Sequence, residues 1–241
     1  MRCPAAPLVT ARSAASRVWF VWTLVWNALV LTAIWPPWML AMTLRPTART
    51  FWRGLRVWVR TVHAGCGFRV VSRGEAPDRA VVYVANHQAM LDIFALAVGI
   101  QAPFVFVARA ELRRLPLVGS VLAHSRCVLL DRRSPGGTRA GLEAARERLA
   151  AGESVLFFPE GTRSYGRALG RFYPGAFRLA LEAGVPVVPV AIDGAYRVLD
   201  ESGKTARPGR VTVRLGTPLP PDGTAADLVL EARAAVDALL P

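Results

Sequence analysis

A histidine and an aspartate stand five positions apart in the chain, at His87 and Asp92. An alcohol that attacks a thioester must lose its proton as the new bond forms, and a neutral imidazole can accept that proton. A carboxylate bound to the other ring nitrogen would fix the tautomer of the imidazole and stabilise its protonated form. The pair therefore indicates general base catalysis. Taken alone, the spacing also fits a histidine that only caps a helix or fills the core.

A second group of chemically useful residues follows at Glu160, Gly161, Thr162 and Arg163. Glycine lets the backbone turn sharply or approach a ligand closely. The guanidinium of Arg163 is a planar fork of donors, which suits a phosphate. Glu160 would either anchor this loop or bind a hydroxyl of a substrate, and an ordinary loop carboxylate is the plainer alternative. The group predicts a site for an anionic substrate.

Both groups come directly after predicted strands. Residues 80–85 and 154–158 are short apolar runs that predict strands, and residues 91–98 predict an apolar helix. On a regular helix, residues five positions apart are about 140° apart around the axis. His87 must therefore precede the helix, while Asp92 lies in its first turns. A junction between a strand and a helix is where α/β enzymes place their chemistry.

The order of the two groups, N-H-x(4)-D followed by F-P-E-G-T-R-S, resembles the glycerolipid acyltransferases typified by 1-acylglycerol-3-phosphate acyltransferase. The resemblance extends over residues 81–192. It implies that His87 is the general base, that Asp92 orients it, and that the block 160–163 helps to bind the phosphate of the acceptor. The implied donor is acyl-CoA or acyl-carrier protein, the implied acceptor is a lysophospholipid, and no cofactor or metal is implied.

Three weaker features accompany these motifs. Residues 108–119 are similar to a family block in which a lysine precedes a leucine, a proline and a glycine, and Arg109 stands at the lysine position. The resemblance assigns Arg109 to the phosphate, although arginine offers a fork where lysine is a point charge. Arg132 lies in a short segment that resembles the family, and a solvated charge is its alternative. Residues 172–175 depart from the lysine-containing family pattern, where Arg171 is the candidate replacement.

The N-terminal region predicts contact with a membrane. No charged residue occurs in residues 18–44, a run long enough to cross a hydrocarbon layer of about 30 Å. Either one helix crosses the bilayer, or a bent pair of helices enters one leaflet. The adjacent Pro36 and Pro37 favour a hairpin bent at that point. More arginines follow the run than precede it, which favours a cytoplasmic catalytic domain if the run crosses.

The next segment, residues 49–62, has two opposite stripes and predicts an amphipathic helix in the membrane interface. A helix packed on the domain with a solvated basic face is the alternative. One stripe is cationic and the other apolar: Arg49, Arg53, Arg56 and Arg60 against Phe51, Leu55, Trp58 and Val62. His63 lies near the arginines and is assigned no chemistry. Tryptophans at positions 19, 22, 26, 35 and 38 suit interfacial anchoring or a helix that faces lipid.

The net charge of +13 comes almost wholly from arginine, since Lys204 is the only lysine. The basic residues alternate with tryptophans and apolar runs and form no recognised nucleic-acid motif. We therefore expect a phospholipid or a phosphate-bearing substrate as the anionic partner, and no nucleic acid. Cys3, Cys66 and Cys127 have no metal-ligand spacing and are odd in number, which indicates a reducing compartment without disulfides.

The sequence predicts the α/β class: a single domain with a mostly parallel sheet flanked by helices, preceded by an N-terminal hydrophobic membrane helix or helical hairpin. Strands are expected near residues 68–72, 80–85, 104–108, 127–130, 154–158, 187–192 and 211–215, with a closing helix near 224–240. Residues 1–64 should associate with the membrane, and residues 65–241 should form the acyltransferase domain, on the cytoplasmic side of the cell inner membrane.

The resemblance favours transfer of a fatty acyl group to 1-acylglycerol-3-phosphate, which would give phosphatidate. The resemblance leaves three alternative acceptors within the family: another lysophospholipid, lyso-ornithine lipid or glycerol 3-phosphate. A membrane-surface protein that binds lipid without turnover is the alternative from a different class.

Overall fold

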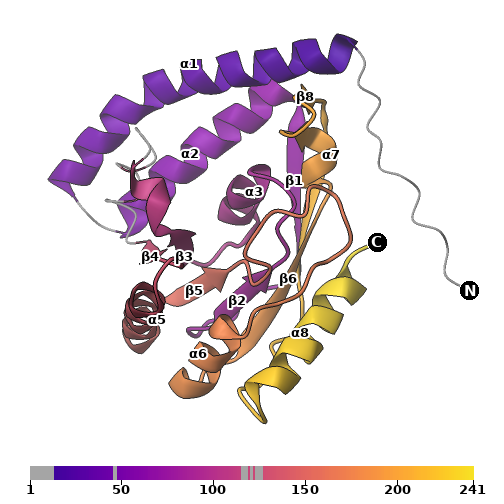
Figure 1. Ribbon diagram of the computed structural model, residues 1–241. Coiled ribbons are helices and arrows are strands. Elements are labelled where there is room, and N and C mark those ends of the chain that lie inside the picture. The colour runs from indigo at the N-terminus through magenta and orange to yellow at the C-terminus, as the bar shows by residue number, and fades with distance from the viewer. Residues whose placement is uncertain (1–13, 46–47, 115–118, 120–121, 123–126) are drawn as a thin grey trace, which may run out of the picture.

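The computed structural model describes the chain except for residues 1–13, 46–47, 115–118, 120–121 and 123–126 (Figure 1). Cys3 and residues 115–118 of the block that begins at residue 108 lie outside the described residues. The main sheet has seven strands in the order β1-β9-β6-β2-β5-β3-β4. All neighbouring strands are parallel except β6 and β9, which are antiparallel. The predicted α/β class with a mostly parallel sheet is therefore confirmed.

The seven strands coincide with the seven apolar runs of the sequence to within about two residues at either end. Their bounds are β1 Phe68–Arg73, β2 Val82–Ala85, β3 Phe104–Arg109, β4 Val128–Leu130, β5 Ser154–Phe157, β6 Val187–Asp193 and β9 Gly209–Leu215. Two further strands, β7 Leu199–Asp200 and β8 Thr205–Ala206, form a separate small hairpin.

Helices cover both faces of the main sheet (Figure 1). On one face lie α2 (Ala48–Cys66) and α3 (Leu91–Gly99); on the other lie α5 (Pro135–Ala150), α6 (Gly175–Ala183) and α8 (Ala225–Leu239). Because side chains alternate along a strand, Tyr83 and Ala85 of β2 pack toward the first face, while Val82 and Val84 pack toward the second. A strand buried on both faces has a continuous apolar sequence, and this pattern predicted β2.

A helical hairpin precedes the sheet, but its bend differs from the predicted one. The first helix, α1 (Ala14–Leu44), continues through Pro36 and Pro37, and α2, which packs against it, begins at Ala48. The prediction of a hairpin bent at the prolines is therefore wrong. Trp38 and Met42, which follow the prolines, are buried against α2, and the ring of Trp38 packs on Phe51. These contacts hold the helix together where proline removes backbone donors.

The apolar stripe of α2 is also placed differently from the prediction. Phe51, Leu55 and Val62 are buried in the core that α2 shares with α1, α3 and the sheet, and Trp58 packs edge-on against Phe94 of α3. The stripe thus faces the protein and not a membrane interface. The expected boundary at residues 64–65 falls within the last turn of α2, and the core is continuous across it.

Arg56 of the cationic stripe has a structural role. Its guanidinium donates to the carbonyl oxygens of Ala97 (3.4 Å) and Gln101 (2.7 Å) and lies over the ring of Trp52. Burial, followed by the charge of Arg60, lowers the pKa of Arg56. Cations are favourable near the C-terminus of a helix, so Arg56 joins α2 to the end of α3.

Three tryptophans of α1 donate hydrogen bonds to the last turns of α2. The indole Nε1 atoms of Trp19, Trp22 and Trp26 bind the carbonyl oxygens of Cys66 (3.2 Å), Gly65 (2.9 Å) and Thr61 (3.1 Å), respectively. The last four carbonyls of a helix, which include those of Gly65 and Cys66 here, have no amide partner within it. Trp19 and Trp22 donate to these two carbonyls, and Trp26 binds a carbonyl one turn earlier.

Close packing of the hairpin depends on glycine. A Cβ atom on Gly54 would lie 2.2 Å from Nε1 of the buried Trp38 ring. We expect Gly54→Ala to lower the free energy of unfolding by about 1–3 kcal/mol, because the steric conflict outweighs the gain of about 1 kcal/mol in helix propensity. Denaturant unfolding in detergent measures the change. Gly136→Ala in α5 is the matched control, since a Cβ there meets nothing within 4 Å, and it should be neutral or stabilising.

Candidate active site

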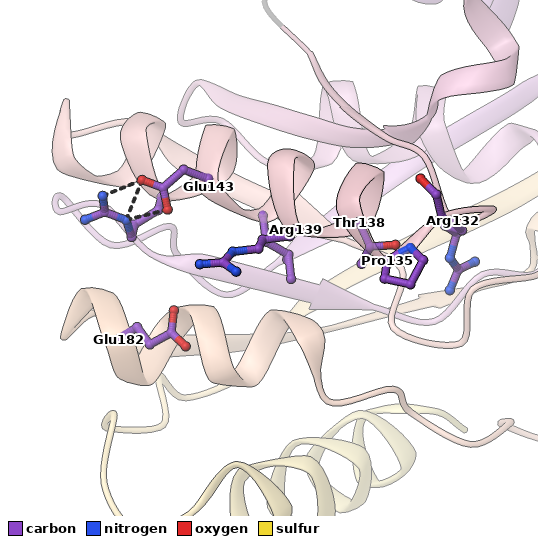
Figure 2. Close-up of a pocket in the computed structure, with 9 residues that line it drawn as sticks. Arg132, Pro135, Thr138, Arg139, Glu143 and Glu182 are labelled. Atoms are coloured by element: carbon purple, nitrogen blue, oxygen red, sulfur yellow. Dashed lines mark hydrogen bonds and ion pairs between the residues drawn. The ribbon is translucent and has the colours of Figure 1, made fainter.

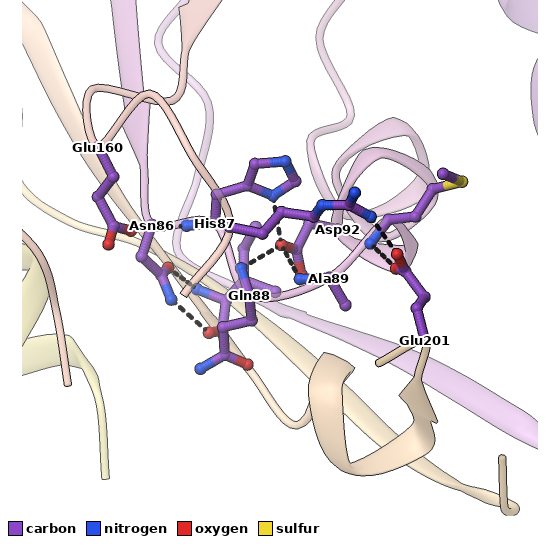
Figure 3. Close-up of polar contacts among 10 residues, drawn as sticks. Asn86, His87, Gln88, Ala89, Asp92, Glu160 and Glu201 are labelled. Carbon is purple, nitrogen blue, oxygen red and sulfur yellow. Dashed lines mark hydrogen bonds and ion pairs between the residues drawn. The ribbon is translucent and has the colours of Figure 1, made fainter. Parts of the chain in front are cut away.

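The first predicted motif forms a loop between β2 and α3, residues 86–90, which we call the His87 loop. Asn86, which is buried, anchors it to β6 with two hydrogen bonds to the backbone of Ile192: its Nδ2 donates to the carbonyl oxygen (2.9 Å) and its Oδ1 accepts from the amide (2.7 Å). This pair holds the start of the loop against the neighbouring strand, at the carboxyl ends of β2 and β6 (Figure 3).

His87 and Asp92 are in direct contact, as their spacing required. The imidazole Nδ1 lies 2.7 Å from Oδ2 of Asp92, which sits in the first turn of α3 and is fully buried. The same oxygen accepts hydrogen bonds from the amides of Gln88 and Ala89. Burial raises the pKa of Asp92, and the hydrogen bonds from His87 and these amides oppose that rise. A carboxylate at Nδ1 favours the tautomer in which Nε2 carries the lone pair.

The ring of His87 is confined but remains accessible. It stacks on Phe158, with the ring centroids 4.0 Å apart and the planes at 18°, and 16% of the side chain is exposed. Asp92 fixes one edge of the ring and Phe158 covers one face. A base held in this way can accept a proton through Nε2 without losing rotamer freedom at that moment.

Glu160 ties the second motif to the first. It is only 7% exposed, and its two carboxylate oxygens accept hydrogen bonds from the backbone amides of His87 and Gly170, both at 2.9 Å. The amide of Ser164 in turn donates to the carbonyl oxygen of His87 (2.7 Å). Of the alternatives weighed for Glu160, the structure matches the anchor, because both oxygens are occupied by backbone donors.

Two arginines converge on the turn of the second motif. Nη2 of Arg109 lies 2.6 Å and Nη1 of Arg132 lies 2.8 Å from the carbonyl oxygen of Gly161. Gly161 has a φ of +68°, and a Cβ there would lie 2.4 Å from Arg132. Glycine is therefore required for both the turn and the close approach. Both arginines are exposed and keep further N–H groups for an anion.

Arg132 was not among the predicted site residues. Its only signal was a short segment of weak specificity, and a solvated charge explained it as well. Its ring partner, Tyr173, lies 5.7 Å from the guanidinium and belongs to the segment 172–175 that departs from the family pattern. The structure brings Arg132 to the site through β4 and the turn before α5.

Arg163 occupies a different place from the other two arginines. Its guanidinium forms an ion pair with Glu201 and lies 5.2 Å from the centre of the Tyr165 ring. The same carboxylate accepts a hydrogen bond from the amide of Met90, in the His87 loop. Glu201 thus joins Arg163 to the start of α3 (Figure 3). Thr162, between Gly161 and Arg163, is exposed.

A groove opens beside this site between α5 and α6 (Figure 2). Its volume is about 660 Å³. Among its lining residues are Arg132, Thr138, Arg139, Glu143 and Glu182, and Arg132 is shared with the contact to Gly161. A volume of this size is typical of small-molecule sites. Through Arg132, the groove adjoins the turn at Gly161.

The described residues contain no cluster of three or more His, Cys, Asp or Glu side chains suited to a metal. Cys66 is buried in the hairpin, where burial raises the pKa of its thiol, and Cys127 precedes β4. His63 is buried beside Phe68, and burial lowers its pKa to about 4. Neither these cysteines nor His63 lies in the His87 loop.

Comparisons with known proteins identify relatives of this chain. A family model described as Acyltransferase matches residues 67–193. A 1-acyl-sn-glycerol-3-phosphate acyltransferase of Chlamydomonas reinhardtii is 41% identical over 167 residues, which are 68% of this chain and 50% of that protein. A lyso-ornithine lipid O-acyltransferase of Pseudomonas aeruginosa is 36% identical over 198 residues, 75% of this chain and 76% of that protein. The chain thus spans half of the algal relative and about three quarters of the bacterial one.

A solved structure has the same fold. The crystal structure of the 1-acyl-sn-glycerophosphate acyltransferase PlsC from Thermotoga maritima superposes with a TM-score of 0.74 at 25% sequence identity. The superposition covers 95% of this chain and 94% of that one, so it includes the N-terminal helices as well as the sheet.

The contact between His87 and Asp92 determines which ring nitrogen carries the proton. We expect ¹⁵N NMR of the imidazole at neutral pH to show the proton of neutral His87 on Nδ1. In Asp92→Asn the amide can donate to Nδ1, so the Nε2–H tautomer should gain population. His63 provides the internal reference, because its ring has no contact with Asp92 among the described residues. An unchanged tautomer in the variant would show that Asp92 does not orient the ring.

Proposed function

The chain belongs to the acyltransferase family, and on this premise we propose that it transfers a fatty acyl group from a thioester donor to the free hydroxyl of a lysolipid. The favoured acceptor is 1-acylglycerol-3-phosphate, and the product is then phosphatidate. The observation that carries the proposal is the contact between His87 and the buried Asp92, in a loop fixed to two neighbouring strands.

The proposed reaction needs one base and no covalent enzyme intermediate. The acceptor hydroxyl oxygen attacks the thioester carbonyl carbon while Nε2 of His87 takes the hydroxyl proton. The C–S bond then breaks, and the thiolate leaves with the proton returned by the imidazolium. Asp92 stabilises the imidazolium between these two steps. A thiolate leaves readily, so a nucleophilic side chain such as a cysteine is unnecessary.

Three arginines support an anionic acceptor. Arg109 and Arg132 present their remaining N–H groups beside the Gly161 carbonyl, and Arg163 follows Gly161 by two residues and pairs with Glu201. We assign the phosphate to this group of side chains, with the turn Glu160–Gly161–Thr162 as its backbone frame. Arginine binds phosphate through paired hydrogen bonds, which fixes the orientation of the acceptor.

The donor is acyl-CoA or acyl-carrier protein. Both present their thioester on a phosphopantetheine arm, and the groove between α5 and α6 lies beside Arg132, which suits such an arm and its phosphates. The relative from Pseudomonas aeruginosa makes lyso-ornithine lipid an alternative acceptor. Glycerol 3-phosphate and other lysophospholipids are further alternatives, and a non-catalytic lipid-binding role is the alternative without turnover.

Residues 1–64 attach the acyltransferase domain, residues 65–241, to the membrane in this proposal. Within the described residues α1 alone is long and apolar enough to cross a membrane, and 6% of its most apolar window is buried. Its 31 residues would extend about 46 Å. If α1 crossed the bilayer, α2 would carry the exposed Arg53 and Arg60 into the hydrocarbon, which is costly. An orientation along one leaflet avoids that cost, and we propose the cytoplasmic leaflet of the inner membrane.

The experiment that tests the reaction is an acyl-transfer assay with purified protein, both donor types and a panel of lysolipids. We expect His87→Ala to lower the turnover by at least about 100-fold, the low end of general base catalysis. Because the variant loses the contacts of the ring with Phe158 and the buried Asp92, its thermal unfolding curve is measured to confirm that it is folded at the temperature of the assay. Near-normal turnover in the folded variant would remove His87 from the mechanism, and no turnover by the wild type with any acceptor would favour the non-catalytic role.

Exposed apolar residues of α1 should hold the protein in the membrane. Val21 and Leu29 are 58% and 57% exposed. We expect the wild type to resist extraction by salt and alkaline carbonate, because apolar burial is not screened as charge attraction is. Val21→Glu with Leu29→Glu should shift at least about tenfold more protein into the soluble fraction. Leu230→Glu in α8, at a position 68% exposed, is the matched control and should stay bound. Equal release of both variants would contradict the role of α1.

A further inference from the structure

A small cavity lies where the N-terminal hairpin meets the sheet and α3. Apolar parts of its wall come from Val59 and Val62 of α2, Phe68 of β1 and Phe94 of α3. The space open to the centre of a water molecule measures about 10 Å³. One water molecule needs roughly 10–15 Å³ by this measure, so the cavity matches a single water and is too small for a lipid head group.

Three polar residues also line this cavity, and each has a buried atom without a hydrogen-bond partner in the described part of the chain. These atoms are Oδ1 of Asn27, Nε1 of Trp58 and Nε2 of His63. A polar atom buried without a partner costs free energy, and most buried polar atoms in proteins are bound to protein or to ordered water. A ligand that bound all three atoms would remove that cost.

The position of Asn27 on α1 directs it toward the protein. Thr23, four positions earlier, and Val30, three positions later, are buried, and residues at these spacings share one face of a helix. Val25 and Leu29, two positions away on either side, are exposed. Asn27 therefore lies on the face of α1 that packs against α2 (Figure 1). A polar side chain on this face has to be satisfied inside the molecule.

The chemistry of the three atoms selects water as the ligand. Nε1 of Trp58 can only donate a hydrogen bond, and Oδ1 of Asn27 can only accept one. Burial lowers the pKa of His63 to about 4, so its ring is neutral at neutral pH. A water molecule has two donors and two acceptors and can bind all three atoms in either tautomer of His63. The indole N–H would repel a cation, and the amide oxygen would repel an anion.

We propose that one ordered water molecule binds in this cavity and links α1 to α2 through Asn27, Trp58 and His63. Three hydrogen bonds are typical of a buried water in a protein. Asn27 belongs to α1 and the other two residues belong to α2, so the water fixes the packing of the first helix on the second. The site is separate from the His87 loop and independent of the proposed acyl transfer.

A crystal structure of the full chain, at a resolution that shows ordered water, tests the site directly. We expect one peak of electron density within about 2.7–3.2 Å of Oδ1 of Asn27, Nε1 of Trp58 and Nε2 of His63. Absence of this peak, with the three side chains ordered, would overturn the proposal. A structure in which other protein atoms bind these three atoms would overturn it as well.

A substitution in α1 tests the link in solution. Asn27→Leu has a similar shape but leaves the water with two partners. We expect its Tm in detergent to lie at least about 2 °C below that of the control Thr32→Val. Thr32 is an exposed residue of α1 whose hydroxyl donates to the carbonyl oxygen of Ala28 in the same helix (2.9 Å), so the control also removes a polar group.

The opposite result is expected if no water is bound. Oδ1 of Asn27 would then be unpaired in the wild type, and an apolar group in its place would stabilise the protein. A Tm of Asn27→Leu that lies within about 2 °C of the control, or above it, would therefore overturn the proposal.

Discussion

The site depends on one buried carboxylate that joins two loops. Glu160 leaves β5, and its side chain accepts the amide of His87, which follows β2, and the amide of Gly170 further along its own loop. Breaking this contact would cost much free energy, because a carboxylate excluded from water must be matched by hydrogen-bond donors. If the donors moved, the charge would be left unpaired. The position of His87 is therefore coupled to the turn at Gly161, where the arginines meet.

The sheet order makes this coupling possible. β2 lies between β5 and β6, so the loop that follows β2 has the loops of both neighbours beside it. The side chain of Asn86 is hydrogen-bonded to Ile192 of β6, and the amide of His87 is hydrogen-bonded to Glu160, which follows β5. Parallel strands place all three loops at the same edge of the sheet, which is where ligands bind in open α/β folds. Side chains from distant parts of the sequence are thus held within hydrogen-bond distance.

Local patterns predicted the sheet and the contact between His87 and Asp92, because both follow from short-range rules of burial and helical geometry. They failed where tertiary contacts decide. Pro36 and Pro37 predicted a hairpin bend, yet α1 continues as a helix through both, and Trp38 packs on α2. The apolar stripe that includes Leu55 could have packed against a membrane or against the protein. In the structure it packs against the protein. Glu201 lies 38 positions from Arg163 and 111 from Met90 and belongs to no motif, so only the fold brings it to the site.

The tryptophan hydrogen bonds of the hairpin affect how readily the C-terminal end of α2 can leave water. Trp19, Trp22 and Trp26 donate to the carbonyls of the last turns of α2. Exposed carbonyls normally require water, and a lipid phase offers none. The indoles of Trp19 and Trp22 donate to two terminal carbonyls in place of water. Transfer of this helix end to an apolar phase would therefore cost less free energy than transfer of an end whose carbonyls were all unpaired.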